Sequence, residues 1–101
     1  MRIISGKFKG RRLKAPKNLP VRPTTDMAKE GLFNILNNQY YFDSIAVIDL
    51  FSGTGNISYE FASRGTKDIY AIDAHYNCIR YINNTAKEFD FEINTYKSDV
   101  Y

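Results

Sequence analysis

Cysteine and histidine are almost missing from this sequence, which has only Cys78 and His75. A single cysteine excludes an intramolecular disulfide and is typical of a protein kept in a reducing cytoplasm. One Cys and one His cannot fill a four-ligand zinc site, so no metal is expected. No apolar run approaches the ~20 residues of a membrane helix, and the first residues lack the apolar core of a signal peptide. We therefore expect a cytoplasmic protein with no membrane partner.

Acidic residues are missing from the first 25 positions, and this absence divides the chain. The eight basic residues before Asp26 are Arg2, Lys7, Lys9, Arg11, Arg12, Lys14, Lys17 and Arg22. Six basic and eleven acidic residues follow, so the rest of the chain is net acidic. A basic arm (residues 1–23) on an acidic body is typical of a protein that binds nucleic acid. A solvated basic tail without a specific partner is the alternative.

The arm and the next segment give the first structural predictions. Ile3–Ile4 and residues 11–13 flank a segment with two glycines and can pair as a short hairpin, with Phe8 either offered to RNA or packed. Residues 24–39 predict a helix that Thr24 or Thr25 caps and that ends at Asn37–Asn38. Its expected apolar face consists of Ala28, Leu32, Ile35 and Leu36, widened by Met27 and Phe33.

From residue 44 onward the pattern alternates between strand and helix. Strands are expected at 45–51, 69–73 and 92–97, and helices at 56–64 and 78–89. The first two strands are apolar on both faces, which is typical of strands buried between two helix layers. This spacing predicts an α/β fold with a parallel sheet and right-handed crossovers. At 101 residues the chain has room for one small domain.

The segment 45–56, together with Asp73, predicts a nucleotide-cofactor pocket. Ligands of open parallel sheets bind beyond the carboxyl ends of the strands, where Asp49 and the loop with Gly53 and Gly55 lie. The glycines allow close approach to a ligand, and the N-terminus of the next helix offers N–H groups. Asp73 ends the second strand and can accept both hydroxyls of a ribose. The alternative is a tight turn that needs glycine only for its geometry, with both acids as caps or surface groups.

The acids favour S-adenosylmethionine over a dinucleotide. Ser58 occupies the third glycine position of the dinucleotide fingerprint, and Asp49 would face a pyrophosphate. S-adenosylmethionine carries an ammonium and a sulfonium, which suit a nearby carboxylate. Asp99 and the Val100 N–H can bind the adenine. An NAD(P)-binding domain and a non-catalytic RNA-binding module remain as alternatives. Cys78 is expected to pack in the core and His75 to lie in a loop, so neither is expected to act as a nucleophile.

Three motifs carry a resemblance to one family. The first motif is residues 1–13. The second is the run Arg22-Pro23-Thr24-Thr25-Asp26 with Lys29-Glu30 and residues 32–34, and the third is the run 49–55 with Glu60 and residues 63–65. Together they span most of the chain. They resemble the RsmD-like 16S ribosomal RNA guanine-N2 methyltransferases. The resemblance implies a class I methyltransferase fold with strand order 3-2-1-4-5-7-6, of which this chain would supply strands 1 to 3. It also implies 16S rRNA, or the small ribosomal subunit, as partner.

The resemblance assigns roles to individual residues. The residues expected to bind S-adenosylmethionine are Arg22, Thr24, Thr25, Asp49, Phe51, Ser52, Gly53, Gly55, Asp73, Ala74, Asp99 and Val100. Those expected to contact rRNA are Lys7, Lys9, Arg11, Arg12 and Lys14. The domain boundaries expected are 1–23 for the RNA-contacting arm and 24–101 for the N-terminal half of the cofactor-binding domain.

One family motif is missing from the sequence. The family's catalytic Asp/Asn-Pro-Pro-Tyr/Phe run follows a fourth strand, whereas no proline follows Pro23 here. We therefore expect an N-terminal part of a larger protein, with no catalytic residue of its own and inactive alone. The edge of the strand at 45–50, which the fourth strand would cover, is expected to promote self-association of the isolated chain.

Overall fold

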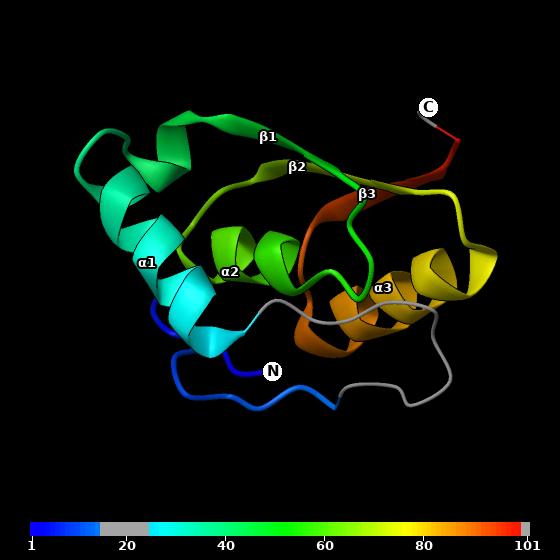
Figure 1. Cartoon of the computed structure of the whole chain (residues 1–101), viewed down its shortest axis with the longest axis horizontal. Helices are drawn as coiled ribbons and strands as arrows, with labels where there is room; N and C mark the ends of the chain where they lie inside the picture. The colour runs from blue at the N-terminus through cyan, green and yellow to red at the C-terminus, as the bar shows by residue number, and fades with distance from the viewer. Residues whose placement is uncertain (15–24, 100–101) are drawn as a thin grey trace.

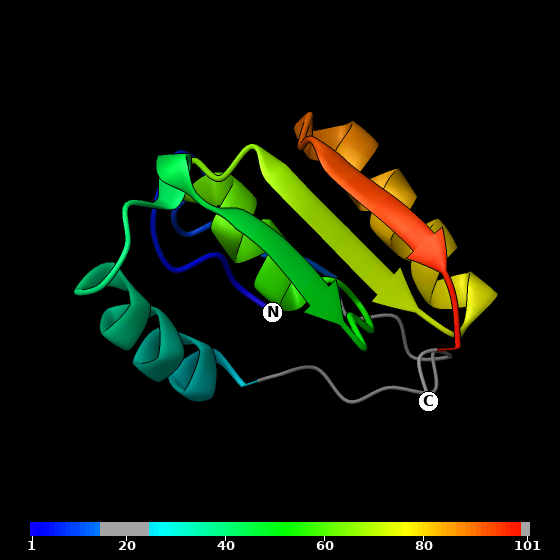
Figure 2. The ribbon, with the colours of Figure 1, turned by 90° about the horizontal axis from the view of Figure 1, so that it is seen from above.

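A three-stranded parallel sheet forms the centre of the fold in the computed structural model, which describes residues 1–14 and 25–99. The strands are β1 (Ala46–Leu50), β2 (Asp68–Asp73) and β3 (Ile93–Lys97), in the order β1-β2-β3. Figure 2 shows them side by side with β2 in the middle. In this register Asp49 of β1 is paired with Ala71 of β2. The predicted strands and their parallel pairing are confirmed.

Helices lie on one side of this sheet. They are α1 (Asp26–Asn37), α2 (Asn56–Ser63) and α3 (Tyr76–Phe89), and a short 3-10 turn, η1 (Phe42–Ser44), precedes β1. Figure 1 shows α2 and α3 beneath the strands. The expectation of two helix layers is wrong for the described residues, because alternate side chains of β1 face away from the helices. Ile48 is 65% exposed and Leu50 is 50% exposed.

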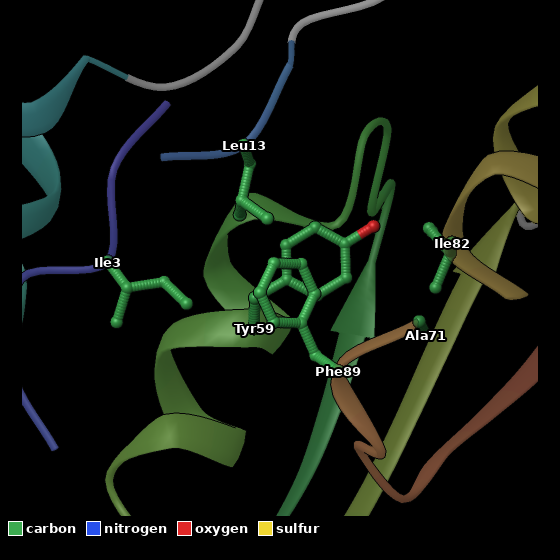
Figure 3. Packing of buried hydrophobic residues seen from close by; sticks show 6 residues of the cluster. All are labelled: Ile3, Leu13, Tyr59, Ala71, Ile82 and Phe89. Carbon is green, nitrogen blue, oxygen red and sulfur yellow. The ribbon is translucent and has the colours of Figure 1, made fainter. Parts of the chain in front are cut away.

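Two clusters of buried side chains hold these layers together. The first joins the arm to the body through Ile3, Leu13, Tyr59, Ala71, Ile82 and Phe89. Figure 3 shows Ile3 and Leu13 of the arm on one side of the Tyr59 ring and Ile82 of α3 on the other. The second cluster fastens α1 and η1 to the body through Phe33, Phe42, Phe61 and Ile69. No helix among the described residues has the length and apolar content needed to cross a membrane.

Helix α1 buries a different face from the one expected. Thr25 caps it by accepting a hydrogen bond from the Ala28 N–H, and Asn38 ends it, as predicted. Its buried residues are Lys29 and Phe33, whereas Ile35 is 60% exposed and Leu32 42%. The predicted face of Ala28, Leu32 and Ile35 is therefore wrong, and only Leu36 of that set packs against the core, half-buried. The helix is turned so that the Lys29 ammonium reaches a buried carboxylate of α2.

The described part of the arm, residues 1–14, folds back on itself as predicted. Arg2 and Arg12 form an antiparallel bridge, and the Ile3 N–H donates to the Arg11 carbonyl at 2.9 Å. Phe8 lies edge-on to Phe89 and Phe91, with ring centroids 5.7 and 5.1 Å away. Of the two readings of Phe8, packing is therefore the one that the structure supports.

Candidate cofactor site

The loop between β1 and α2 is fastened to the end of β2. Ser52 donates to the Ile72 carbonyl from its backbone N–H at 2.9 Å, and the Gly53 N–H donates to Asp73 Oδ2 at 2.9 Å. The loop then turns through Gly55, whose N–H donates to the Ser52 carbonyl. These bonds join the loop to Asp73 at the carboxyl edge of the sheet, where Asp49 of β1 also lies, as the sequence predicts.

Glycine is required in this loop for a reason that lies beneath it. Gly55 has a φ of +85°, and a Cβ there would lie 2.7 Å from Tyr59 Cζ and 2.8 Å from its hydroxyl oxygen. The Tyr59 side chain is fully buried under the loop. Gly53 has a φ of +57°, and Phe51, which is not a glycine, has one of +58°. The backbone of this turn is therefore left-handed at three positions and closely packed from below.

Asp73 is buried and carries three hydrogen bonds. Its Oδ1 accepts from the His75 N–H at 2.9 Å and lies 3.1 Å from His75 Nδ1, while its Oδ2 accepts from Gly53. Burial acts to raise the pKa of Asp73, but the bonds from His75 and Gly53 outweigh it and hold the pKa below its usual value. Asp73 is therefore ionised at neutral pH. Each carboxylate oxygen has two acceptor directions, so these three bonds leave one direction, on Oδ2, for a ligand hydroxyl.

Asp49 is hydrogen-bonded to a residue of α2. Its Oδ2 accepts a hydrogen bond of 2.7 Å from the hydroxyl of Ser58, which is fully buried. Burial raises the pKa of Asp49, the charge of Asp73 adds to this effect, and the bond from Ser58 opposes it. Sequence reasoning noted Ser58 only because it is not glycine. Its role in orienting Asp49 becomes visible only when α2 is placed against β1.

The other predicted cofactor residues are distributed as follows. Ala74 follows Asp73 directly, and the Ser98 N–H donates to the Asp73 carbonyl at 3.0 Å. This bond brings the segment with Asp99 to the same edge of the sheet. Phe51 is 56% exposed at the start of the loop. Thr25 uses its side chain to cap α1. Arg22, Thr24 and Val100 lie outside the described residues.

The chemistry of this site fits a cationic nucleotide-like ligand. Two carboxylates flank the loop, and residues 49–56 contain no basic side chain. The third glycine position of a dinucleotide fingerprint is taken by Ser58, and its hydroxyl is committed to Asp49. A pyrophosphate would meet the Asp49 charge, whereas an ammonium or sulfonium would be attracted by it.

Asp73, His75 and Cys78 form a compact cluster, with one possible ligand atom from each within 4.8 Å of the others. The Cys78 side chain is buried, as predicted, and burial raises the pKa of its thiol. His75 lies in the loop between β2 and α3, as predicted, and is hydrogen-bonded to Asp73.

The arm is anchored to α2 by buried polar groups that sequence reasoning missed. Glu60 accepts from the Ile4 N–H at 2.8 Å and from the Ser5 N–H at 3.0 Å. Ser63 accepts from the Lys7 N–H through its carbonyl at 2.8 Å. A Cβ on Gly6 would lie 2.0 Å from that carbonyl oxygen, so the arm touches α2 backbone to backbone. The arm is therefore a fixed part of the fold over these residues.

Lys29 links the arm, α1 and the start of α2. Its fully buried ammonium lies 3.2 Å from Glu60 Oε1 and donates to the Arg2 carbonyl at 2.6 Å and to Asn56 Oδ1 at 2.8 Å. Burial lowers the pKa of Lys29, and Glu60 opposes this shift. Arg64 completes the set with a 2.7 Å bond to Glu60 Oε2. Because Asn56 follows Gly55, this network connects the arm to the predicted cofactor loop.

The predicted RNA contacts are placed around the outside of the arm. Lys7, Lys9, Arg11, Arg12 and Lys14 are all exposed. The Arg11 guanidinium lies over the Phe89 ring at 4.9 Å, and Lys7 lies 5.5 Å from the centre of the Phe8 ring. Figure 1 shows the arm on the side of α2 that faces away from the sheet. The arm thus carries these cations on a rigid, outward-facing support.

Comparison with known proteins identifies the family. Residues 1–101 match the family described as "Conserved hypothetical protein 95". A protein of Bacillus subtilis named "Putative rRNA methyltransferase YlbH" is 37% identical over 102 residues, which cover 99% of this chain and 54% of that protein. Ribosomal RNA small subunit methyltransferase D of Haemophilus influenzae is 38% identical over 69 residues, 68% of this chain and 35% of that protein.

Solved structures agree on the fold. Hypothetical protein TTHA0928 of Thermus thermophilus superposes with a TM-score of 0.84 at 24% identity, covering 99% of this chain and 56% of that one. The chain thus spans about half the length of the Bacillus and Thermus proteins that it matches. A structure titled "Putative methyltransferase yhhF from Escherichia coli" superposes with a TM-score of 0.82 at 25% identity over 98% of this chain and 52% of that one, so the three parallel strands fit a truncated Rossmann-like methyltransferase fold. By its motifs, its fold and the match along its whole length, the chain belongs to the Conserved hypothetical protein 95 family, the RsmD-like methyltransferases.

Proposed function

We propose that this chain is the S-adenosylmethionine-binding, N-terminal part of a methyltransferase that modifies the 2-amino group of a guanine in small-subunit rRNA. The observation that carries the proposal is the pair of carboxylates, Asp49 and Asp73, on either side of the loop at the carboxyl edge of the sheet. The relatives whose names include rRNA methyltransferase support the reaction class and the rRNA substrate. Such a protein would work in the cytoplasm, where rRNA is found.

Within this proposal each residue has a physical task. Asp49 and the loop with Gly53 and Gly55 would hold the amino-acid part of the cofactor. Asp73 would bind the ribose, and Asp99 with Val100 would bind the adenine. S-adenosylmethionine, when bound, supplies a methyl group on a positively charged sulfur. Ser58 and the bonds to Asp73 fix both carboxylates in advance, so little ordering remains to be done on binding.

The arm would supply the RNA contacts. Lys7, Lys9, Arg11, Arg12 and Lys14 would pair with phosphates, so RNA affinity should fall as salt is added. The target base would leave its stack to reach the cofactor. The residues that position the guanine amine belong to the Pro-Pro motif, which this sequence does not contain. We therefore expect cofactor binding but no methyl transfer from these 101 residues.

Calorimetric titration tests the cofactor assignment. The chain should bind S-adenosylmethionine and not NAD, and Asp73→Ala should lose that binding. Asp68→Ala is the matched control, because Asp68 starts the same strand at its opposite, exposed end. Binding of NAD in preference to S-adenosylmethionine would reject the cofactor assignment. Methylation of small-subunit rRNA by the purified chain would reject the expectation that the chain alone is inactive.

A further inference from the structure

A polar groove runs between the arm and α1, on the opposite flank of the arm from α3. It has a volume of about 460 Å³, and its polar walls include Arg2 and Lys9 of the arm, Glu30, Asn34 and Asn37 of α1, and Arg64 after α2. We call it the arm–α1 groove. Sites for small molecules commonly have volumes of about 300–1,000 Å³, so this groove has room for a nucleotide.

Two of the donors in the groove, Arg64 and Arg2, have partners in the ligand-free structure. Arg64 is fixed by its Nε bond to Glu60, and its guanidinium lies 4.6 Å from the centre of the Phe33 ring. That bond uses one of the five N–H groups of the side chain. Arg2 is held through its carbonyl by Lys29, and its own guanidinium lies 3.8 Å from Asp26. A ligand that binds here therefore meets an Arg64 guanidinium that is already oriented.

The composition of the groove favours RNA backbone. Three cations and one carboxylate line the groove, and when the adjoining Lys29, Glu60 and Asp26 are included the balance is one positive charge. Asn34 and Asn37 are exposed and three residues apart on α1, so they lie on the same side of the helix. Their amides can donate to phosphate and exchange hydrogen bonds with a ribose 2′-hydroxyl, the group that distinguishes RNA from DNA. Lys9, which belongs to the predicted RNA surface of the arm, also lines the groove.

We propose that the arm–α1 groove binds a segment of RNA backbone, with Arg2, Lys9 and Arg64 on phosphate and Asn34 and Asn37 on sugar or phosphate. This inference rests on the proposed rRNA function and extends it to α1 and Arg64, to which no sequence pattern assigned a role in RNA binding. The RNA would then span the arm from its exposed cations to α1.

Fluorescence anisotropy with a short labelled RNA stem-loop, at about 50 mM salt, tests the groove. Asn34→Asp/Asn37→Asp adds two negative charges to its wall and should weaken RNA binding about tenfold, with a less steep salt dependence. Lys87→Glu changes the net charge by the same amount on exposed α3 surface outside the groove and should change affinity less than about twofold. Asn34→Ala/Asn37→Ala adds no charge and should give a smaller loss, and thermal unfolding confirms that each variant is folded.

The outcomes separate the groove from the general function. Equal losses in Asn34→Asp/Asn37→Asp and Lys87→Glu would overturn the groove. So would an unchanged affinity in the groove variants when Arg11→Glu/Arg12→Glu abolishes binding, although the arm would then keep its RNA role. Equally tight binding of a polyglutamate peptide would reject RNA as the occupant. No RNA binding by the unaltered chain would reject both the groove and the RNA part of the proposed function, while leaving the cofactor titration to be judged by itself.

Discussion

Ser58 and Asp49 form the hydrogen bond that ties the first turn of α2 to the end of β1, with 2.7 Å between the serine hydroxyl and Oδ2. Ser58 is buried and Asp49 is half-buried, and the bond lowers the pKa of a carboxyl that burial raises. The proposed cofactor site therefore has one carboxylate whose ionisation depends on a neighbouring hydroxyl, and a second, Asp73, whose ionisation is secured by backbone N–H groups.

The raised pKa of Asp49 predicts a pH dependence of cofactor binding. A cationic ligand favours the ionised carboxylate, so affinity for S-adenosylmethionine should rise as pH increases through that pKa. In the ligand-free protein the sign is opposite: the folded state holds the proton more tightly, so the free energy of unfolding falls over the same window. Calorimetric titrations across acidic pH measure the first effect. Ser58→Ala should move the rise to higher pH, and Asp49→Asn should remove this rise; an unchanged profile in both would contradict the assignment.

Gly55→Ala should destabilise the chain by about 3 kcal/mol, because the new Cβ meets the buried Tyr59 ring at a left-handed backbone position. Gly31→Ala is the matched control: Gly31 lies within α1 with nothing within 4 Å of a new Cβ. That change should stabilise the chain by roughly 1 kcal/mol. Urea unfolding of both variants measures the difference, and similar stabilities would show that the loop does not rest on Tyr59 as described.

The buried pair of Lys29 and Glu60 predicts an asymmetric mutational response. Glu60→Leu should cost about 3–5 kcal/mol, since it leaves the Lys29 ammonium buried without its counter-charge. Lys29→Met should cost less, because Arg64 and the Ile4 and Ser5 N–H groups still satisfy Glu60. The double variant should be more stable than the sum of the two single losses implies. Strict additivity in unfolding experiments would show that the two charges do not interact.

The open edge of β1 and the exposed apolar side chains on and next to this strand together predict self-association of the chain. Ile48 is 65% exposed, Leu50 50% and Phe51 56%. Unpaired strand edges with apolar side chains favour edge-to-edge pairing. Sedimentation should therefore show concentration-dependent association that Ile48→Lys reduces, whereas Glu92→Lys before β3 should not. A concentration-independent monomer for the unaltered chain would refute this prediction.

Local patterns predicted most of the fold because they depend on neighbours in the chain. The strands, the parallel order, the cap at Thr25 and the burial of Cys78 follow from periodicity and turn residues. The buried face of α1 could not be found in this way, since a lysine reads as a surface residue until Glu60, 31 positions later, is placed beside it. The buried face of α1 is therefore set by a tertiary contact with Glu60, which hydrophobic periodicity does not reveal.

The candidate site, like the fold, could be predicted only where its residues are marked by their position in the sequence. The loop with Gly53 and Gly55 could be predicted because it follows an apolar strand. Asp49 and Asp73 could be predicted because each lies at the end of such a strand. The role of Ser58 could not be predicted in this way, because serine in the first turn of a helix can serve many purposes. The reason for glycine at position 55 was also hidden, since it depends on the Tyr59 ring packed below the turn.

The most direct test of the central claim is an NMR titration of the isotopically labelled chain with S-adenosylmethionine. If the loop and Asp73 form the cofactor site, the amide signals of Gly53, Gly55 and His75 should shift most, while those of Lys9 and Asn34 on the RNA side stay in place. Asp73→Ala should abolish these shifts. Shifts confined to the arm, or no shifts at saturating ligand, would contradict the assignment of this loop to the cofactor.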